Sequence, residues 1–299
     1  MREERAQGST TPAWVEVHAG RTGLALPLVC DSPHSGTRYP EDYRHAIDRR
    51  ALRMGEDTHI DRLWGHAPEV GATLVLAHFP RTYIDPNRAL SDMDPSMIDG
   101  PWPGEAQPGP RTLALGMGLV WRQTPTRLPI YDRLLSVQEV QGRIDHCWRP
   151  YHAALRQACD GAVARWGSCW HLDLHSMPSN AYQRLGLPGH RKLADFVLGD
   201  LNGRSCDPSF RDWVSQVMRE HGYQVSVNDP YEGQELVRVH GRPAEHRHSL
   251  QIEVNRALYM DEATREPHEG FERLRADIAS MLGEIARFVR WRVREGSDS

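Results

Sequence analysis

Two histidines follow apolar, strand-like segments, and each lies where its segment breaks into a turn. In LPLVCDSPHSGTRYP (residues 26–40) the apolar run ends and His34 follows on a proline- and glycine-braced corner. In WHLDLHSMPS (170–179), His171 and His175 lie on one face of an extended run whose other face carries leucines. Buried, hydrogen-bonded core histidines are one interpretation of this pattern. The other is a pair of imidazoles that bind a metal at the ends of two strands.

A metal site built on two histidines needs a carboxylate, and GEDTHIDRLW (55–64) supplies candidates in Glu56, Asp57 and Asp61. Asp57 is equally a candidate helix N-cap, because a helical apolar pattern begins at Ile60. Zinc accepts histidine nitrogen and carboxylate oxygen in three-ligand sites that leave one position open for water. Two histidines and one carboxylate match that composition, but ligands so far apart in sequence have little spacing specificity.

A further carboxylate, Glu253, lies in HSLQIEVNRALYMDE (248–262). Leu250, Ile252 and Val254 alternate with polar residues there, so Glu253 falls on the polar face of a predicted strand. A solvated carboxylate on a half-exposed sheet is the ordinary interpretation. The chemical one is a general base, which takes a proton from a water activated by a metal.

Arginines in HFPRTYIDPNRAL (78–90) are candidates for binding an acidic substrate. A planar guanidinium offers paired donors that match a carboxylate, which makes Arg81 and Arg88, with Asn87, a possible substrate clamp. In a chain whose 36 basic residues are almost all arginine, an exposed turn arginine is the simpler interpretation.

Strand-like and helical patterns alternate along the 299 residues, which predicts a single α/β domain with a mixed, mostly parallel sheet flanked by helices. Ligands collect at the carboxyl edge of such sheets. We expect helices over 136–166, where Ser136 and Glu139 form a capping box, and over 207–222 and 270–292. Strands are expected at LALPLVCDS, GATLVLAHF, RTYIDP, SCWHLDLHS, KLADFVLGD, YQVSVN and HSLQIEV.

Composition excludes several classes of protein. No apolar run reaches the length of a membrane span, and the polar first dozen residues carry no apolar leader, so we expect a cytoplasmic protein. The net charge is −4 without a basic–aromatic cluster, which argues against nucleic-acid binding. Five scattered cysteines without a C-x-x-C pair indicate reduced thiols. The Pro- and Gly-rich segment 91–130 is expected to form a long surface loop that is either functional, as a lid or pocket wall, or disordered.

Taken together and in order, the motifs resemble the N-formylglutamate amidohydrolase (N-formylglutamate deformylase) family. The resemblance spans about residues 25–290 and rests on blocks that are specific only in combination. They are SPHSGTRYP, DTHIDRLW, RTYIDPNRAL, WRPYHAAL, DLHSMPS, LGDLNGRSC, VNDPYEG and LQIEVNRALYMDE. It implies a fold similar to that of zinc carboxypeptidases, with a single catalytic domain over 21–295 after a flexible segment 1–20.

The resemblance also implies site residues. His34 and His175 correspond to zinc ligands, but Thr37 stands where the carboxypeptidase pattern has a glutamate ligand. The third ligand therefore falls to the DTHID block, with Asp57 as the choice and Glu56 in reserve. Glu253 corresponds to the general base. The substrate carboxylate clamp corresponds to Asn87 and Arg88, supported by Arg81.

A hydrogen bond from a neighbouring residue normally fixes the tautomer of a metal-binding imidazole. Asp31 and Asp173 are the candidates for this support.

The activity implied is hydrolysis of N-formyl-L-glutamate to formate and glutamate by one Zn²⁺ per chain, as in histidine degradation. The expected partner is this small molecule, with neither nucleic acid nor membrane, and nothing in the sequence indicates an oligomeric state. Arg111, Arg122 and Arg143 are equal candidates for the second carboxylate of the substrate. Two alternatives stay open: a hydrolase of another N-acyl amino acid, or a carboxypeptidase-like enzyme, and a catalytically silent metal- or amino-acid-binding protein.

Overall fold

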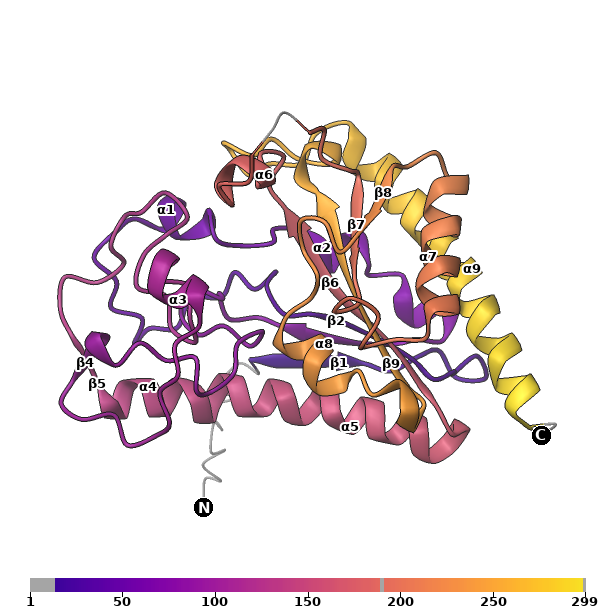
Figure 1. Cartoon of the computed structure of the whole chain (residues 1–299), viewed down its shortest axis with the longest axis horizontal. Coiled ribbons are helices and arrows are strands. Elements are labelled where there is room, and N and C mark those ends of the chain that lie inside the picture. Colours follow the sequence, from indigo (N-terminus) through magenta and orange to yellow (C-terminus); the bar gives the residue numbers. More distant parts are fainter. Residues whose placement is uncertain (1–13, 189–190, 298–299) are drawn as a thin grey trace, which may run out of the picture.

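A seven-stranded sheet with helices on both faces organises the chain (Figure 1). The computed structural model describes residues 14–188 and 191–297. The strands of this sheet are β1 (Val15–His18), β2 (Leu28–Ser32), β3 (Thr73–Ala77), β6 (Cys169–Met177), β7 (Phe196–Gly199), β8 (Val225–Val227) and β9 (Arg247–Asn255). Their order is β1-β3-β2-β6-β9-β7-β8, and the four strands β3, β2, β6 and β9 are parallel. Antiparallel pairing joins β1 to β3 and β7 to β9, so the predicted mixed, mostly parallel α/β fold is confirmed.

Helices cover the two faces of the sheet unequally. They are α1 (Arg49–Arg53), α2 (Ile60–Leu63), α3 (Pro110–Leu115), α4 (Val137–Arg143), α5 (Arg149–Trp166), α6 (Ala181–Arg184), α7 (Pro208–Glu220), α8 (Glu235–His240) and α9 (Gly270–Ser297). On one face, α2, α7 and α9 pack on a largely apolar surface that includes Leu172, Leu174 and Ile252. Figure 1 shows α5 on the other side of the sheet, away from α7 and α9. This second face carries Asp31, His171 and Asp173, so period-two alternation sends the polar side chains of the strands to one side.

The predicted helix boundaries agree with the capping residues. Ser136 and Glu139 form the expected capping box, and the helical run continues through α4, a π-helical turn (Ile144–Trp148) and α5. Asp207 caps the start of α7, as the Asp-Pro pair indicated. These helices therefore begin where the local hydrogen-bonding side chains in the sequence place them.

Other segments differ from expectation. RTYIDP (81–86) is a series of turns and not a strand, because its backbone bends to bring polar groups toward the sheet edge. The 91–130 segment is a long excursion with little regular structure. It contains α3 and the short strand β4 (Ile98–Asp99), which pairs with β5 (Leu135–Ser136) in a separate two-stranded sheet.

Residues 1–13 lie outside the described part of the chain; within the segment 1–20 expected to be flexible, β1 forms an edge strand. The domain limits 21–295 remain a prediction. Among the described residues, no helix combines the length and apolar character needed to cross a membrane.

Acid should weaken the fold through His248, which stacks on Trp170 with ring centroids 4.1 Å apart and accepts a hydrogen bond from the Asp207 amide. Burial lowers the pKa of His248 from 6.5 to about 4. The folded chain thus keeps this ring neutral where the unfolded chain protonates it. The stabilisation is complete above pH 6.5 and is lost as the pH falls from 6.5 to 4.

The expected slope from this group is about 1.4 kcal/mol per pH unit. Urea unfolding at several pH values should show a flatter slope for His248→Asn, which keeps an acceptor but cannot titrate. Equal slopes for the two proteins would show that His248 does not contribute.

Candidate metal centre and active site

The candidate side chains meet at the carboxyl ends of the central parallel strands. His34 follows β2, His175 lies near the end of β6, and Glu253 is the register partner of His175 on β9. Adjacent parallel strands lie about 4.8 Å apart, so partners in register present neighbouring side chains on the same face. Asp57 comes from the connection between α1 and α2, and its amide donates to the His34 carbonyl at 3.0 Å. That backbone bond brings the fourth segment to the same edge.

Three ligand atoms converge at this edge. His34 Nδ1 lies 3.0 Å from His175 Nδ1, and Asp57 Oδ2 lies 3.3 Å from the first and 3.0 Å from the second. All three side chains are buried, and together they could hold a metal ion. The N-cap of α2 is His59 and not Asp57, so the Asp57 carboxylate is free to face the histidines.

Carboxylates hold the outer nitrogens of both imidazoles. Asp85 Oδ1 lies 2.7 Å from His34 Nε2, and Asp173 Oδ1 lies 2.7 Å from His175 Nε2, although the second contact is not aligned as a hydrogen bond. A carboxylate at Nε2 favours the tautomer whose Nδ1 is unprotonated, which is the usual support for a metal-binding histidine. Sequence reasoning named Asp173 for such a role and missed Asp85.

The environment keeps Asp57 ionised. Burial alone would raise its pKa, but contacts with His175, His34 and Arg81 hold the pKa well below its usual value. Its second oxygen accepts from the Arg256 guanidinium at 2.8 Å. The centre thus presents one carboxylate oxygen and two imidazole nitrogens to each other, and such a set of ligand atoms is suited to binding a cation between its members. The residues present therefore fit a divalent metal.

Glu253 is buried beside this centre, with 8 % of its surface exposed, and not solvated as an ordinary sheet carboxylate would be. Gln251 donates to its Oε1 at 3.0 Å. Burial raises the pKa of Glu253 to about 7; His175 opposes this shift and Asp57 adds to it. A carboxyl group with a pKa near 7 can both accept and return a proton at neutral pH.

The centre opens into a cavity of about 170 Å³ that arginines line. Arg88 and Arg111 both line it, and Arg88 is itself buried. Burial lowers the pKa of Arg88 to about 10, and the positive charges of Arg111 and Arg81 add to that effect. The Arg88 Nε and Nη1 atoms donate to the carbonyls of Met117 and Asn87, which leaves Nη2 without a hydrogen-bond partner in the described part of the chain.

The other two clamp residues have structural contacts of their own. Arg81 donates to Asp85 Oδ2 from Nε and Nη2, at 3.2 and 2.9 Å, while its side chain stacks on Trp121. Asn87 Nδ2 lies 3.1 Å from His175 Nε2, and its Oδ1 accepts from the Leu236 amide. Both residues line the cavity, but Arg81 already has a carboxylate partner in Asp85. Arg88 has only the more distant Asp92, whose Oδ2 lies 3.7 Å from the Arg88 Nε.

Several sequence candidates lie away from the cavity. Glu56 is buried, but it contacts the Tyr39 hydroxyl and Arg53 and not the histidines. Arg122 pairs with Asp94, while Arg143 is enclosed by tyrosines, so only Arg111 of the three candidates for a second carboxylate lines the cavity.

Asp31, the other proposed support for a ligand, contacts His171 and Tyr151 and neither of the two histidines at the centre. Arg256, which sequence reasoning did not single out, contacts Asp57 directly.

A His–His–Asp cluster and a buried glutamate at the strand ends of an α/β fold are typical of hydrolases that use a metal ion. The sequence model of the N-formylglutamate amidohydrolase family matches residues 26–260. N-formylglutamate deformylase of Pseudomonas putida is 32% identical over 249 residues, covering 82% of this chain and 84% of its own. The chain therefore belongs to the N-formylglutamate amidohydrolase family.

Two solved structures are similar to this chain in fold. N-formylglutamate amidohydrolase from Ralstonia eutropha JMP134 is 54% identical, with a TM-score of 0.90 over 93% of this chain and 99% of that one. A gene product of Agrobacterium tumefaciens, 19% identical with a TM-score of 0.59 over 94% of this chain and 96% of that one, shares the fold.

Proposed function

We propose that this chain hydrolyses the formamide bond of N-formyl-L-glutamate to formate and L-glutamate, using one Zn²⁺ held by His34, Asp57 and His175. One observation carries the proposal: a buried glutamate, a three-ligand cluster and unpaired arginine donors share one cavity of about 170 Å³. That volume suits a substrate the size of an amino acid. The substrate is inferred from the names of the related enzymes, and the reaction type is supported by the geometry of the site.

The donor set suits zinc in particular. Zinc–nitrogen and zinc–oxygen bonds of about 2.0–2.1 Å in a tetrahedral site imply ligand atoms roughly 3.3–3.4 Å apart. The three ligand atoms are separated by 3.0–3.3 Å. Imidazole nitrogens with a carboxylate also fit a borderline metal better than Mg²⁺ or Ca²⁺, which prefer oxygen ligands.

The chain's own residues would move the proton and orient the reacting groups. A bound zinc would supply the Lewis acid that polarises the formyl oxygen and lowers the pKa of the attacking water. Glu253 takes a proton from that water as the new C–O bond forms at the formyl carbon. It returns the proton to the amide nitrogen as the C–N bond breaks, which releases the amine of glutamate. Asp85 and Asp173 hold the two histidines, and Arg256 holds Asp57.

Arginines would place the substrate in the cavity. We assign the α-carboxylate to the Arg88 Nη2, which has no other partner in the described residues, with Asn87 beside it. Arg81 acts mainly by holding Asp85. The second carboxylate is assigned to Arg111, because an electropositive cavity with two separate guanidinium groups favours a dicarboxylate.

Arg88→Ala should reduce kcat/KM for N-formylglutamate by about 10²-fold, since it removes a buried charge partner of the carboxylate. The loss should be much smaller for N-butylformamide, which has no carboxylate. Steady-state kinetics on both substrates would test this. Arg122→Ala is the matched control, because it removes an arginine that lies in the 91–130 excursion and outside the cavity, and it should leave both values near the wild-type level. An equal loss on both substrates would remove Arg88 from the clamp.

Formate release would test the reaction itself. We expect turnover of N-formyl-L-glutamate to exceed that of N-formyl-aspartate, N-formyl-methionine and N-acetyl-glutamate. Stripping the metal with a chelator should abolish activity, and added Zn²⁺ should restore it. Turnover confined to another acyl amino acid would keep the reaction type and change the substrate. Full activity after verified metal removal, or none in the zinc-loaded protein, would contradict the proposal.

A further inference from the structure

A second pocket, of about 940 Å³, adjoins the metal centre but is not part of it. The two hollows share a wall: Asp57 lines the catalytic cavity, whereas the next residues, Thr58 and His59, line this second pocket. Ser35, which follows the ligand His34, lines it as well. None of these features is used by the proposed reaction.

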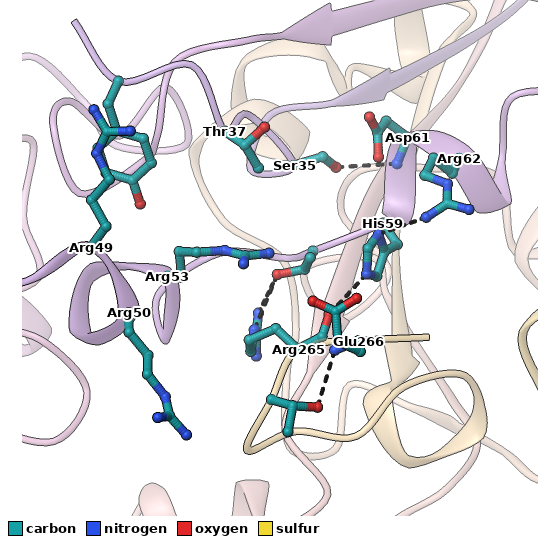
Figure 2. Close-up of a pocket in the computed structure, with 13 residues that line it drawn as sticks. Ser35, Thr37, Arg49, Arg50, Arg53, His59, Asp61, Arg62, Arg265 and Glu266 are labelled. Carbon is teal, nitrogen blue, oxygen red and sulfur yellow. Dashed lines mark hydrogen bonds between the residues drawn. The ribbon is translucent and has the colours of Figure 1, made fainter. Parts of the chain in front are cut away.

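Arginines from two distant parts of the chain surround this pocket (Figure 2). Figure 2 shows Arg49, Arg50 and Arg53 on the N-terminal ribbon around α1, and Arg265 on the loop before α9. Arg62, on α2, completes the group, which we term the arginine pocket. Two carboxylates, Asp61 and Glu266, also line it. Five guanidinium groups against two carboxylates give the lining a positive charge.

Most of this charge is not neutralised within the chain. Among the described residues, only Arg53 of the five has a carboxylate within ion-pair distance, namely Glu56 at 3.3 Å. Arg49 lies over the Tyr39 ring and Arg62 over the Phe271 ring. Such stacking fixes the side chain while its outward N–H groups stay available to a ligand.

Arg265 is the most unusual member. Its surface is 2 % exposed, yet its hydrogen bonds reach only neutral oxygens, those of the Thr58 hydroxyl and the Glu56 carbonyl. Its Nη1 has no hydrogen-bond partner in the described part of the chain. Burial lowers the pKa of Arg265 to about 10, and the positive charge of Arg256 adds to this. The more distant carboxylates Glu56 and Asp57 oppose this shift, but none of the described carboxylates lies within ion-pair distance of Arg265. A buried cation without a close counter-ion is costly unless a partner is supplied.

We propose that the arginine pocket is a binding site for a small multivalent anion bearing phosphate or paired carboxylate groups. The guanidinium groups offer planar, paired donors, which match the oxygens of these groups. A pocket of this size also admits a ligand larger than a single inorganic ion.

Hydrogen bonds connect the arginine pocket to the segment that carries Asp57. Arg265 on one side and Arg256 on the other both donate to the Glu56 carbonyl, and Arg256 also reaches Asp57 Oδ1 at 2.8 Å. His59, with a left-handed φ of 72°, bonds the Arg265 carbonyl at 2.9 Å. An anion near Arg265 would reduce its repulsion with Arg256 and stabilise the segment that carries Asp57. We therefore expect the bound anion to slow the loss of metal to a chelator.

The test is calorimetric titration of the full, metal-loaded chain with inorganic phosphate and, separately, glutarate, in chloride buffer of matched ionic strength. Each titration is repeated on Arg88→Ala, because the catalytic cavity also offers donors for a dicarboxylate. The double variant Arg50→Gln/Arg62→Gln should weaken binding by roughly tenfold or more. Arg273→Gln/Arg287→Gln, at exposed arginines on α9 away from the pocket, is the matched control and should bind as the wild type does. Binding of phosphate alone or glutarate alone would identify which chemistry the pocket prefers.

Clear outcomes would overturn the proposal. The first is that neither anion binds. The second is that the Arg50→Gln/Arg62→Gln variant binds as tightly as the wild type. The third is that Arg88→Ala loses all binding, which would place the anion in the catalytic cavity. The titration needs no turnover, so its failure is distinct from failure of the proposed reaction. Release of metal to a chelator at an unchanged rate with saturating anion would overturn the link to Asp57.

Discussion

Replacing Glu253 by glutamine should lower kcat for N-formylglutamate by about 10²- to 10⁴-fold, the range typical of losing a general base. The side chains have nearly the same shape, and the amide can still accept a hydrogen bond from Gln251, so the fold and KM should change little. The amide cannot take a proton from water. Steady-state kinetics and metal analysis of the same preparations would measure both effects.

Metal content separates this role from metal binding. Glu253 is not one of the three converging ligands, so Glu253→Gln should bind zinc with the same stoichiometry as the wild type. Glu272→Gln, the same chemical change at a largely exposed position on α9, is the control and should retain full activity. Near-normal turnover in Glu253→Gln would show that another group takes the proton.

The strand-end histidines were predictable because their signals are local. An apolar run that stops at a turn marks a strand end, and parallel strands bring their carboxyl ends to one edge. These signals made a metal site at His34 and His175 one of two interpretations, and alternation placed Glu253 on the polar face of its strand. The resemblance to the family decided between the interpretations. The capping residues likewise marked the helix boundaries. Such information lies within a few residues of each position.

Contacts made across the chain were harder to predict. Asp85 lies in RTYIDP, whose β-branched and aromatic residues indicate a strand. The segment instead forms a series of turns, which direct the Asp85 side chain toward His34. Arg81 was expected to meet substrate, yet it binds Asp85 four residues away. No local pattern distinguishes an arginine that binds substrate from one that holds a carboxylate. That distinction depends on which groups the tertiary fold places within reach.

The choice between Glu56 and Asp57 depended on the same kind of information. Neighbouring residues in a connection point in different directions, and the sequence does not say which one faces the histidines. The backbone bond from the Asp57 amide to the His34 carbonyl fixes the direction of this segment. It turns Asp57 toward the ligands and Glu56 toward Tyr39 and Arg53.

Asp57→Asn should therefore remove most of the bound metal and lower turnover by about 10²-fold or more at limiting zinc, since a neutral amide replaces a charged ligand. Titration with a chromogenic zinc chelator would measure the affinity. Glu56→Gln is a matched control one residue away, with the same carboxylate-to-amide change in an equally buried side chain. It should retain zinc and activity even if its lost contacts with Tyr39 and Arg53 reduce stability. If Glu56→Gln lost the metal and Asp57→Asn kept it, Glu56 would be the third ligand. The assignment of Asp57 rests on its Oδ2, which lies within 3.3 Å of both histidine nitrogens. If both variants bound zinc as tightly as the wild type, neither carboxylate would be a ligand and this assignment would be overturned.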